Sequence, residues 1–316
     1  MTNRPPPPDT LQPPPATPSP MRGRFAPSPT GPLHFGSLLA AFGSWLAARH
    51  AGGEWWIRIE DVDQGRELPG AARAQLRTLA AFGLEHDGAV VRQSERSGLY
   101  AAALDRLLDE GLAFECHCSR SDVARSGGIH RACRAGARRP DPAMRVRVPD
   151  GSHAAFDDAV HGHVAQDVAR EAGDFVLRRA DGWWAYQLAV VVDDAAQEIT
   201  DVVRGADLLD STPRQLLLQR ALGLPQPRYL HLPLVLDGDG RKLSKSRASL
   251  PVDDADPLPA LRSAWRVLGQ DPRMLPARTG LGATLLAAVR AFDPARIPRG
   301  PLPAPALHNA TAMPRA

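Results

Sequence analysis

The chain has 316 residues, of which 43% are hydrophobic and 23% are charged, and its formal net charge is +3 at pH 7. These values are typical of a globular protein and exclude a largely disordered chain. No stretch contains the roughly 20 consecutive apolar residues of a transmembrane helix, so we expect a cytoplasmic protein that does not bind membranes.

The amino-terminal segment 1–21 is dominated by proline. It has no apolar run of the kind found in signal peptides, and proline at this density disfavours both helix and strand. We therefore expect a disordered, solvated tail.

Residues 22–112 alternate between strand and helix patterns. Residues 24–29 predict a short strand that runs into a glycine-proline turn, and residues 37–49 predict an alanine-rich helix that ends at Gly52 and Gly53. An aromatic and β-branched strand is predicted over 54–61. Helices are expected over two later segments, 69–83 and 99–110.

The three cysteines of the chain all lie in the next segment. Cys116 and Cys118 are followed, after eleven residues, by His130 and Cys133. An odd cysteine number in a chain without secretory features argues against a disulfide framework. Zinc takes four thiolate or imidazole ligands in a tetrahedron, so this spacing predicts a closed, structural zinc site in an insertion over 113–180. Three unrelated buried thiols are the structural alternative.

Strand and helix patterns return after the insertion. A continuous apolar run predicts a buried strand over 183–194, and a second strand is predicted over 199–205. A helix over 213–222 follows, with Ser211 or Thr212 as its cap. Residues 229–240 predict a strand that runs into a glycine turn.

This alternation predicts an α/β protein with a parallel, Rossmann-type nucleotide-binding sheet. Its first half covers 22–112 and its second half covers 181–250, with the zinc-binding insertion between them. A short helical region is expected over 251–290. A loosely held tail rich in proline and alanine is expected over 291–316.

Two polar segments far apart in the sequence suit phosphate binding. His34, Gly36 and Ser37 lie at the predicted start of the helix 37–49, where unpaired N–H groups attract anions. Lys242 and Lys245, with Ser244 and Ser246, follow the glycine turn near residue 240. Two lysines on such a loop can neutralise the charge that develops during phosphoryl chemistry. Taken singly, each segment has a structural alternative, a helix cap or a solvated basic loop.

Together these segments resemble the H-I-G-H and K-M-S-K-S signatures of class I aminoacyl-tRNA synthetases. They appear here as "HFGS" and "KLSKS", and "RFAPSPTGPLHFGS", "RIEDVD", "YQLAVVVDD" and "ITDVVRGADLLDSTPRQ" resemble the catalytic domain of glutamyl-tRNA synthetases. Only seventy residues follow Ser246, fewer than the helical anticodon-binding region of those enzymes requires. The sequence is most similar to their truncated paralogues, the glutamyl-queuosine tRNA(Asp) synthetase family, in its length, its cysteine-rich insertion and the serine at position 37.

The resemblance implies an activity, its substrates and its partners. The enzyme would activate L-glutamate with ATP and Mg²⁺, without needing tRNA. It would then transfer glutamate to the queuosine base in the anticodon stem-loop of tRNA(Asp). We expect one structural Zn²⁺ per chain and a monomer.

The resemblance also implies residue roles. It assigns His34, Lys242 and Lys245 to catalysis, and Gly36, Ser37, His34 and Lys245 to ATP. The expected glutamate site consists of Arg24, Phe25, Ala26, Pro27, Ser28, Glu60, Tyr186 and Arg204. A guanidinium suits a buried carboxylate because its donors form a fork. The structural alternatives are that Arg204 pairs with Asp201 or Asp207 and that Tyr186 is a core aromatic residue.

The sequence departs from the family pattern at two positions. His130 stands where the family pattern has a tyrosine ligand, and it lies one residue closer to Cys133. Gln187 replaces an asparagine that commonly follows the tyrosine at 186. Two rival functions are a conventional glutamyl-tRNA synthetase and a non-catalytic RNA-binding paralogue.

Overall fold

The structure is a computed structural model that describes residues 20–237, 239–240 and 251–303. Lys242, Ser244, Lys245 and Ser246 lie outside the described residues, as does most of the proline-rich tail. None of the helices in the described part of the chain has the length and apolar character needed to cross a membrane.

A seven-stranded sheet in the order β3-β2-β1-β9-β10-β6-β7 forms the centre of the fold. Neighbouring strands are parallel except for β6 and β7, which form an antiparallel hairpin at one edge. The strands are β1 Arg22–Phe25, β2 Glu54–Ile59, β3 Val91–Arg92, β6 His153–Asp158, β7 Gly162–Asp167, β9 Asp201–Gly205 and β10 Arg228–Leu232. This topology confirms the predicted α/β class with a mainly parallel sheet.

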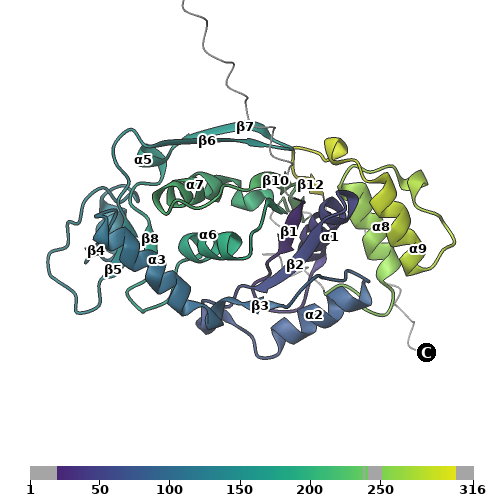
Figure 1. Ribbon diagram of the computed structural model, residues 1–316, viewed down its shortest axis with the longest axis horizontal. Coiled ribbons are helices and arrows are strands. Elements are labelled where there is room, and N and C mark those ends of the chain that lie inside the picture. The colour runs from purple at the N-terminus through teal and green to yellow at the C-terminus, as the bar shows by residue number, and fades with distance from the viewer. Residues whose placement is uncertain (1–19, 238, 241–250, 304–316) are drawn as a thin grey trace, which may run out of the picture.

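Helices cover both faces of the sheet (Figure 1). One apolar cluster joins the sheet to α1 Phe35–His50, α2 Ala71–Ala81, α8 Pro257–Val267 and α9 Leu281–Ala291. A second cluster joins it to α3 Ser97–Asp109, α6 Tyr186–Ala196 and α7 Thr212–Ala221. The carboxyl ends of the parallel strands therefore open between two helical layers, where α/β folds bind ligands.

The prediction of a buried strand over 183–194 is wrong, because α6 occupies Tyr186–Ala196. Every residue from Leu188 to Asp194 is buried in the second apolar cluster or beside it. A helix buried on all sides carries no polar stripe, so its continuous apolar run has the same appearance as a strand of a covered sheet. Valine favours strands, but tertiary packing overrides that preference here.

The predicted insertion is only partly separate from the sheet. A three-stranded antiparallel sheet forms its outer part, with β4 Ala113–Cys116, β5 Ala143–Val146 and β8 Val176–Arg178. The short helices α4 Arg120–Arg125 and α5 Val168–Glu171 belong to the same region. β6 returns to the central sheet, where Asp158 pairs with Tyr229 of β10. One hairpin of this segment thus extends the nucleotide-binding fold.

The expectation of a loosely held tail from residue 291 is wrong for the described residues 291–303. Phe292 and Ile297 are buried in the first apolar cluster, and β12 Leu302–Pro303 pairs with β11 Val235–Leu236. Gly269 explains how the chain packs so closely, since a Cβ there would lie 2.1 Å from the carbonyl oxygen of Arg296. A segment rich in proline and alanine is therefore ordered here, because it packs against the first apolar cluster and pairs with β11.

Replacing Phe292 by alanine is expected to lower the free energy of unfolding by about 3–5 kcal/mol, because a buried aromatic side chain leaves a cavity. Its ring lies 5.9 Å from that of His50 on α1. The control is Leu286→Ala on the neighbouring helix α9, where the side chain is 51% exposed and the expected change is below about 0.5 kcal/mol. Urea denaturation measures both, and equal effects would contradict the packing described here.

Candidate active site

A cavity of about 770 Å³ lies at the carboxyl ends of β1, β9 and β10. It is lined by every described residue that the sequence predicted for ATP or glutamate: Arg24, Phe25, Ala26, Pro27, Ser28, His34, Gly36, Ser37, Glu60, Tyr186 and Arg204. The structure thus brings segments from residues 24–37, 60, 186 and 204 to one place.

His34 is the N-cap of α1, and its imidazole folds back over the first turn of the helix. The backbone N–H of Ser37 donates to His34 Nδ1 at 3.2 Å, and Ser37 Oγ lies 3.0 Å from His34 Nε2. Because Nδ1 accepts, the ring proton belongs on Nε2, which donates to Ser37 Oγ. Gly36 keeps this geometry open, since a Cβ there would lie 3.2 Å from the imidazole.

Two residues that follow the lysine-rich segment in the sequence contact this turn. Pro251 forms a β-bridge with His34, and the N–H of Val252 donates to the carbonyl oxygen of Leu33 at 3.1 Å. Pro251 also lines the cavity, as does Val235 before the loop. The described residues on either side of "KLSKS" therefore lie at the same cavity as "HFGS", and the lysines themselves are outside the described residues.

Arg24 is buried and already paired with a carboxylate. Its Nε and one terminal nitrogen lie 3.1 and 3.4 Å from the two oxygens of Asp194. The fully buried Arg58 donates to Asp194 at 2.8 Å and to Glu60 at 3.3 Å. Burial would raise the pKa of Asp194, but Arg24 and Arg58 outweigh it and lower that pKa.

Glu60 differs from Asp194 in its electrostatics. Burial raises the pKa of Glu60, against the opposing effects of Arg58 and Arg24. A cationic group entering the cavity beside this carboxyl would favour its ionised form.

Arg204 is 5% exposed, and its hydrogen-bond partners among the described residues are neutral. It donates to Tyr186 Oη at 3.1 Å, to Gln215 Oε1 at 2.8 Å and to the hydroxyl of Thr212 at 2.9 Å. Its Nε donates to His231 at 3.1 Å. Within the described ranges no carboxylate forms an ion pair with Arg204, and Asp201 instead pairs with Arg228 at 2.7 Å. A buried guanidinium without a paired anion, beside a cavity, favours an anionic ligand.

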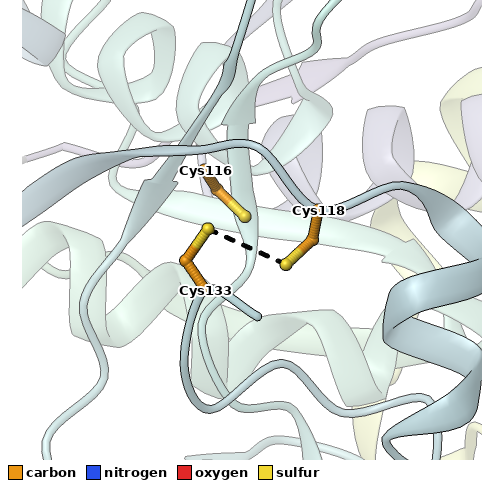
Figure 2. A group of neighbouring side chains, drawn as sticks. All are labelled: Cys116, Cys118 and Cys133. Atoms are coloured by element: carbon orange, nitrogen blue, oxygen red, sulfur yellow. Dashed lines mark hydrogen bonds between the residues drawn. The ribbon is translucent and has the colours of Figure 1, made fainter. Parts of the chain in front are cut away.

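The three cysteines converge as the sequence predicted (Figure 2). Their sulfurs lie within 4.8 Å of one another, and those of Cys118 and Cys133 are 3.9 Å apart. Tetrahedral zinc with Zn–S bonds near 2.3 Å separates its sulfurs by about 3.8 Å, so the three thiols fit that ion. Backbone N–H groups of His117 and Arg134 donate to Cys133 and Cys118. Burial would raise the pKa of Cys133, but its hydrogen bonds outweigh burial and lower that pKa, whereas burial raises the pKa of Cys118.

His130 lies beside this cluster but outside the set of mutually close ligand atoms. Its Nε2 is 3.1 Å from Cys116 Sγ, and its Nδ1 is 3.0 Å from Asp174. A carboxylate on the second ring nitrogen is the usual support of a metal-binding histidine. His130 therefore stays a prediction as the fourth ligand.

Sequence reasoning missed the polar residues that hold the site arginines in place. They are Asp194, Arg58, Asp158, His231, Thr212 and Gln215. The available signal was a polar or charged side chain inside an apolar run, as in "VVVDD", "WIRIED" and "YLHLPLV". Buried polar groups need partners, so such positions predict contacts within the fold.

The fold, the cavity and the motifs define the catalytic domain of a class I tRNA synthetase. The family model described as tRNA synthetases class I (E and Q), catalytic domain, matches residues 20–139 and 123–262. The structure is also similar to a glutamate tRNA ligase from Elizabethkingia meningosepticum in complex with its amino acid, with a TM-score of 0.76 and 25% identity. That match covers 91% of this chain and 68% of the ligase.

Relatives of higher sequence identity show to which branch of these synthetases the chain belongs. The chain is 69% identical over 279 residues to a glutamyl-Q tRNA(Asp) synthetase of Xanthomonas oryzae, which covers 88% of this chain and 92% of the relative. It is 54% identical over 279 residues to the protein of the same name from Pseudomonas paraeruginosa, with 88% and 95% covered. The chain belongs to the glutamyl-Q tRNA(Asp) synthetase family, a branch of the class I synthetases, and is an enzyme of the ligase class.

Proposed function

We propose that this enzyme activates L-glutamate with ATP in the absence of tRNA and then transfers the glutamyl group to queuosine in the anticodon of tRNA(Asp). The observation that carries the proposal is the buried Arg204, which lines the cavity and has neutral partners among the described residues. The names of the relatives supply the RNA substrate.

Arg24 and Arg204, two of the arginines that line the cavity, suit one glutamate in different ways. Arg204, whose described partners are neutral, would bind a carboxylate of the substrate through its positive charge and through the terminal nitrogen that contacts Tyr186, since its other terminal nitrogen donates to Thr212 and Gln215. Tyr186, whose hydroxyl accepts from Arg204, can donate its own proton to the same ligand. Glu60 would accept the ammonium group. Arg24 already contacts Asp194, so it would shape the floor of the site and contribute its positive field.

Adenylate formation requires the α-carboxylate of glutamate to attack the α-phosphorus of ATP in line. A carboxylate oxygen forms the new bond to phosphorus, and pyrophosphate leaves with the electron pair of the broken bond. His34 and the start of α1 at Gly36 and Ser37 would hold phosphate oxygens, because N–H groups there meet developing negative charge. Lys245, assisted by Lys242, would neutralise that charge, and Mg²⁺ would accompany ATP.

In the second step a queuosine hydroxyl would attack the activated carbonyl, with AMP as the leaving group. We propose that the departing phosphate accepts the proton. Normal transfer by variants that lack each nearby titratable side chain supports this, and complete loss from one such variant contradicts it.

The test of the first step is ATP–pyrophosphate exchange without tRNA, measured with glutamate, glutamine and aspartate in turn. We expect exchange with glutamate. Exchange only in the presence of tRNA would indicate a conventional glutamyl-tRNA synthetase, and no exchange at high enzyme concentration would indicate a non-catalytic RNA-binding paralogue.

The test of the second step follows labelled glutamate into RNA. The substrate is tRNA(Asp) that carries queuosine, and the matched controls are the same tRNA without queuosine and the same tRNA trimmed of its terminal adenosine. We expect label in the anticodon loop of the first and third RNAs only. Label that depends on the terminal adenosine would refute the proposed acceptor.

We also propose that Cys116, Cys118, Cys133 and His130 hold one structural Zn²⁺. The expected metal content is about one zinc per chain, since a Cys₃His set closes the tetrahedron. His130→Ala should lower zinc affinity about 10- to 100-fold or more, the range for weakened metal support. His117→Ala is the matched control, because its Nδ1 contacts the Arg139 backbone instead. Equal zinc retention by both variants, measured by chelator competition, would exclude His130 as a ligand.

A further inference from the structure

A buried chain of three polar side chains runs from the edge hairpin of the sheet to Arg204. His231 Nδ1 lies 2.7 Å from Asp158 Oδ2, and His231 Nε2 lies 3.1 Å from Arg204 Nε. All three side chains are 5% exposed or less. Each comes from a different neighbouring strand: β6 ends at Asp158, β10 holds His231 and β9 holds Arg204.

The hydrogen bonds leave His231 a single tautomer. The Nε of an arginine can only donate, so His231 Nε2 must accept and carries no proton. The ring proton therefore lies on Nδ1 and is donated to Asp158. Burial lowers the pKa of His231, against the opposing effect of Asp158. The neutral ring is thus the form that this arrangement requires.

Asp158 is itself held in place. The backbone N–H groups of Val160 and His161 each donate to its Oδ1 at 2.9 Å, and the N–H of His231 lies 3.1 Å from Oδ2. The carboxylate accepts from the turn of its own hairpin and from β10. Its oxygens are therefore fixed as acceptors. This arrangement favours the His231 tautomer that has its proton on Nδ1.

We propose that Asp158 and His231 are positioning residues for the substrate-binding arginine: Asp158 fixes the Nδ1–H tautomer of His231, whose Nε2 then holds Arg204 with one terminal nitrogen at Tyr186, beside the cavity, and the other on Thr212 and Gln215. The role assigned to Arg204 rests on the proposed function. We call Asp158, His231 and Arg204 together the relay. Through Asp158, the relay makes the proposed glutamate site depend on the β6–β7 hairpin, which the sequence places in the insertion.

The decisive variant is Asp158→Asn. The introduced amide keeps an acceptor for the hairpin N–H groups but presents donors to His231 Nδ1, which shifts the ring proton to Nε2. Two N–H groups would then face each other at the His231–Arg204 contact. We expect KM for glutamate in the exchange reaction to rise about 10- to 100-fold, because a charged hydrogen bond is lost. KM for ATP should change by less than about twofold.

A matched control and a rescue separate positioning from folding. Asp157→Asn changes the neighbouring carboxylate, which is 86% exposed and pairs with His163, and it should leave both KM values unchanged. His231→Gln supplies an amide oxygen near the Nε2 position and has no tautomer to choose. Asp158→Asn should therefore raise KM for glutamate by a much smaller factor in the His231→Gln background than in the native one.

A purely structural role predicts otherwise. For the single variant, it predicts equal changes in KM for glutamate and KM for ATP, or a lower kcat alone. For the double variant, it predicts that Asp158→Asn raises KM for glutamate equally in both backgrounds. Any one of these results would overturn the proposal.

The tautomer is measurable without any activity. Nitrogen-15 NMR of the full chain labelled at its histidines reports which ring nitrogen carries the proton, and the His231→Gln spectrum assigns the resonance. We expect Nδ1–H in the native protein and Nε2–H in Asp158→Asn. Nε2–H in the native protein would overturn the relay. Absence of glutamate exchange in the native enzyme, with Nδ1–H observed, would instead overturn the proposed function.

Discussion

Replacing His34 by alanine is expected to lower kcat for glutamate-dependent ATP–pyrophosphate exchange by about 100- to 1,000-fold, the cost of losing one preorganised donor to developing charge. The geometry supports this size of effect, because the imidazole lies over the first turn of α1 and lines the cavity. Steady-state exchange at saturating ATP and glutamate measures it.

Two further variants decide why His34 matters. His34→Asn keeps an N-cap of the preferred type. Full activity of that variant would mean that His34 only caps the helix. His50→Ala, at the other end of α1, removes a ring that contacts Phe292 and the carbonyl oxygen of Val289, and it should leave kcat unchanged. An unchanged kcat in folded His34→Ala would contradict the proposed catalytic role.

Arg58→Met is expected to lower the free energy of unfolding by about 3–5 kcal/mol, the cost of breaking a buried ion pair by removing one partner. Arg58 is 0% exposed and contacts Asp194 at 2.8 Å and Gln197 at 2.9 Å. Its removal leaves three carboxylates, the buried Asp193 and Asp194 and the partly buried Glu60, with less positive charge beside them. Urea denaturation monitored by circular dichroism provides the measurement.

The matched control is Arg273→Met, which removes an equally short ion pair at the surface. Arg273 lies 2.7 Å from Asp271, but its side chain is 89% exposed. Solvent screens such pairs, so its loss should cost far less than that of the buried pair. A smaller loss for Arg58→Met than for Arg273→Met would show that burial does not govern the strength of these contacts.

Several features of this protein follow from local sequence. Alternating strand and helix patterns predicted the α/β class, because helix caps, glycine stops and apolar periodicity act within a few residues. The clustered cysteines predicted a common site for the same reason, since short spacings constrain where ligands lie. The residues chosen from the motifs, from Arg24 to Arg204, line one cavity.

Other features required the tertiary structure. The run 183–194 is mostly a helix because it is enclosed on all sides, and residues 291–303 are held by contacts with α1 and β11. The sequence could not distinguish Arg24 from Arg204, but the fold pairs the first with Asp194 and surrounds the second with neutral acceptors. The charge that a buried side chain faces depends on groups far away in the chain. Local patterns therefore determined which elements and residue types exist, and packing between distant segments decided that Arg24 faces a carboxylate while Arg204, among the described residues, faces neutral groups.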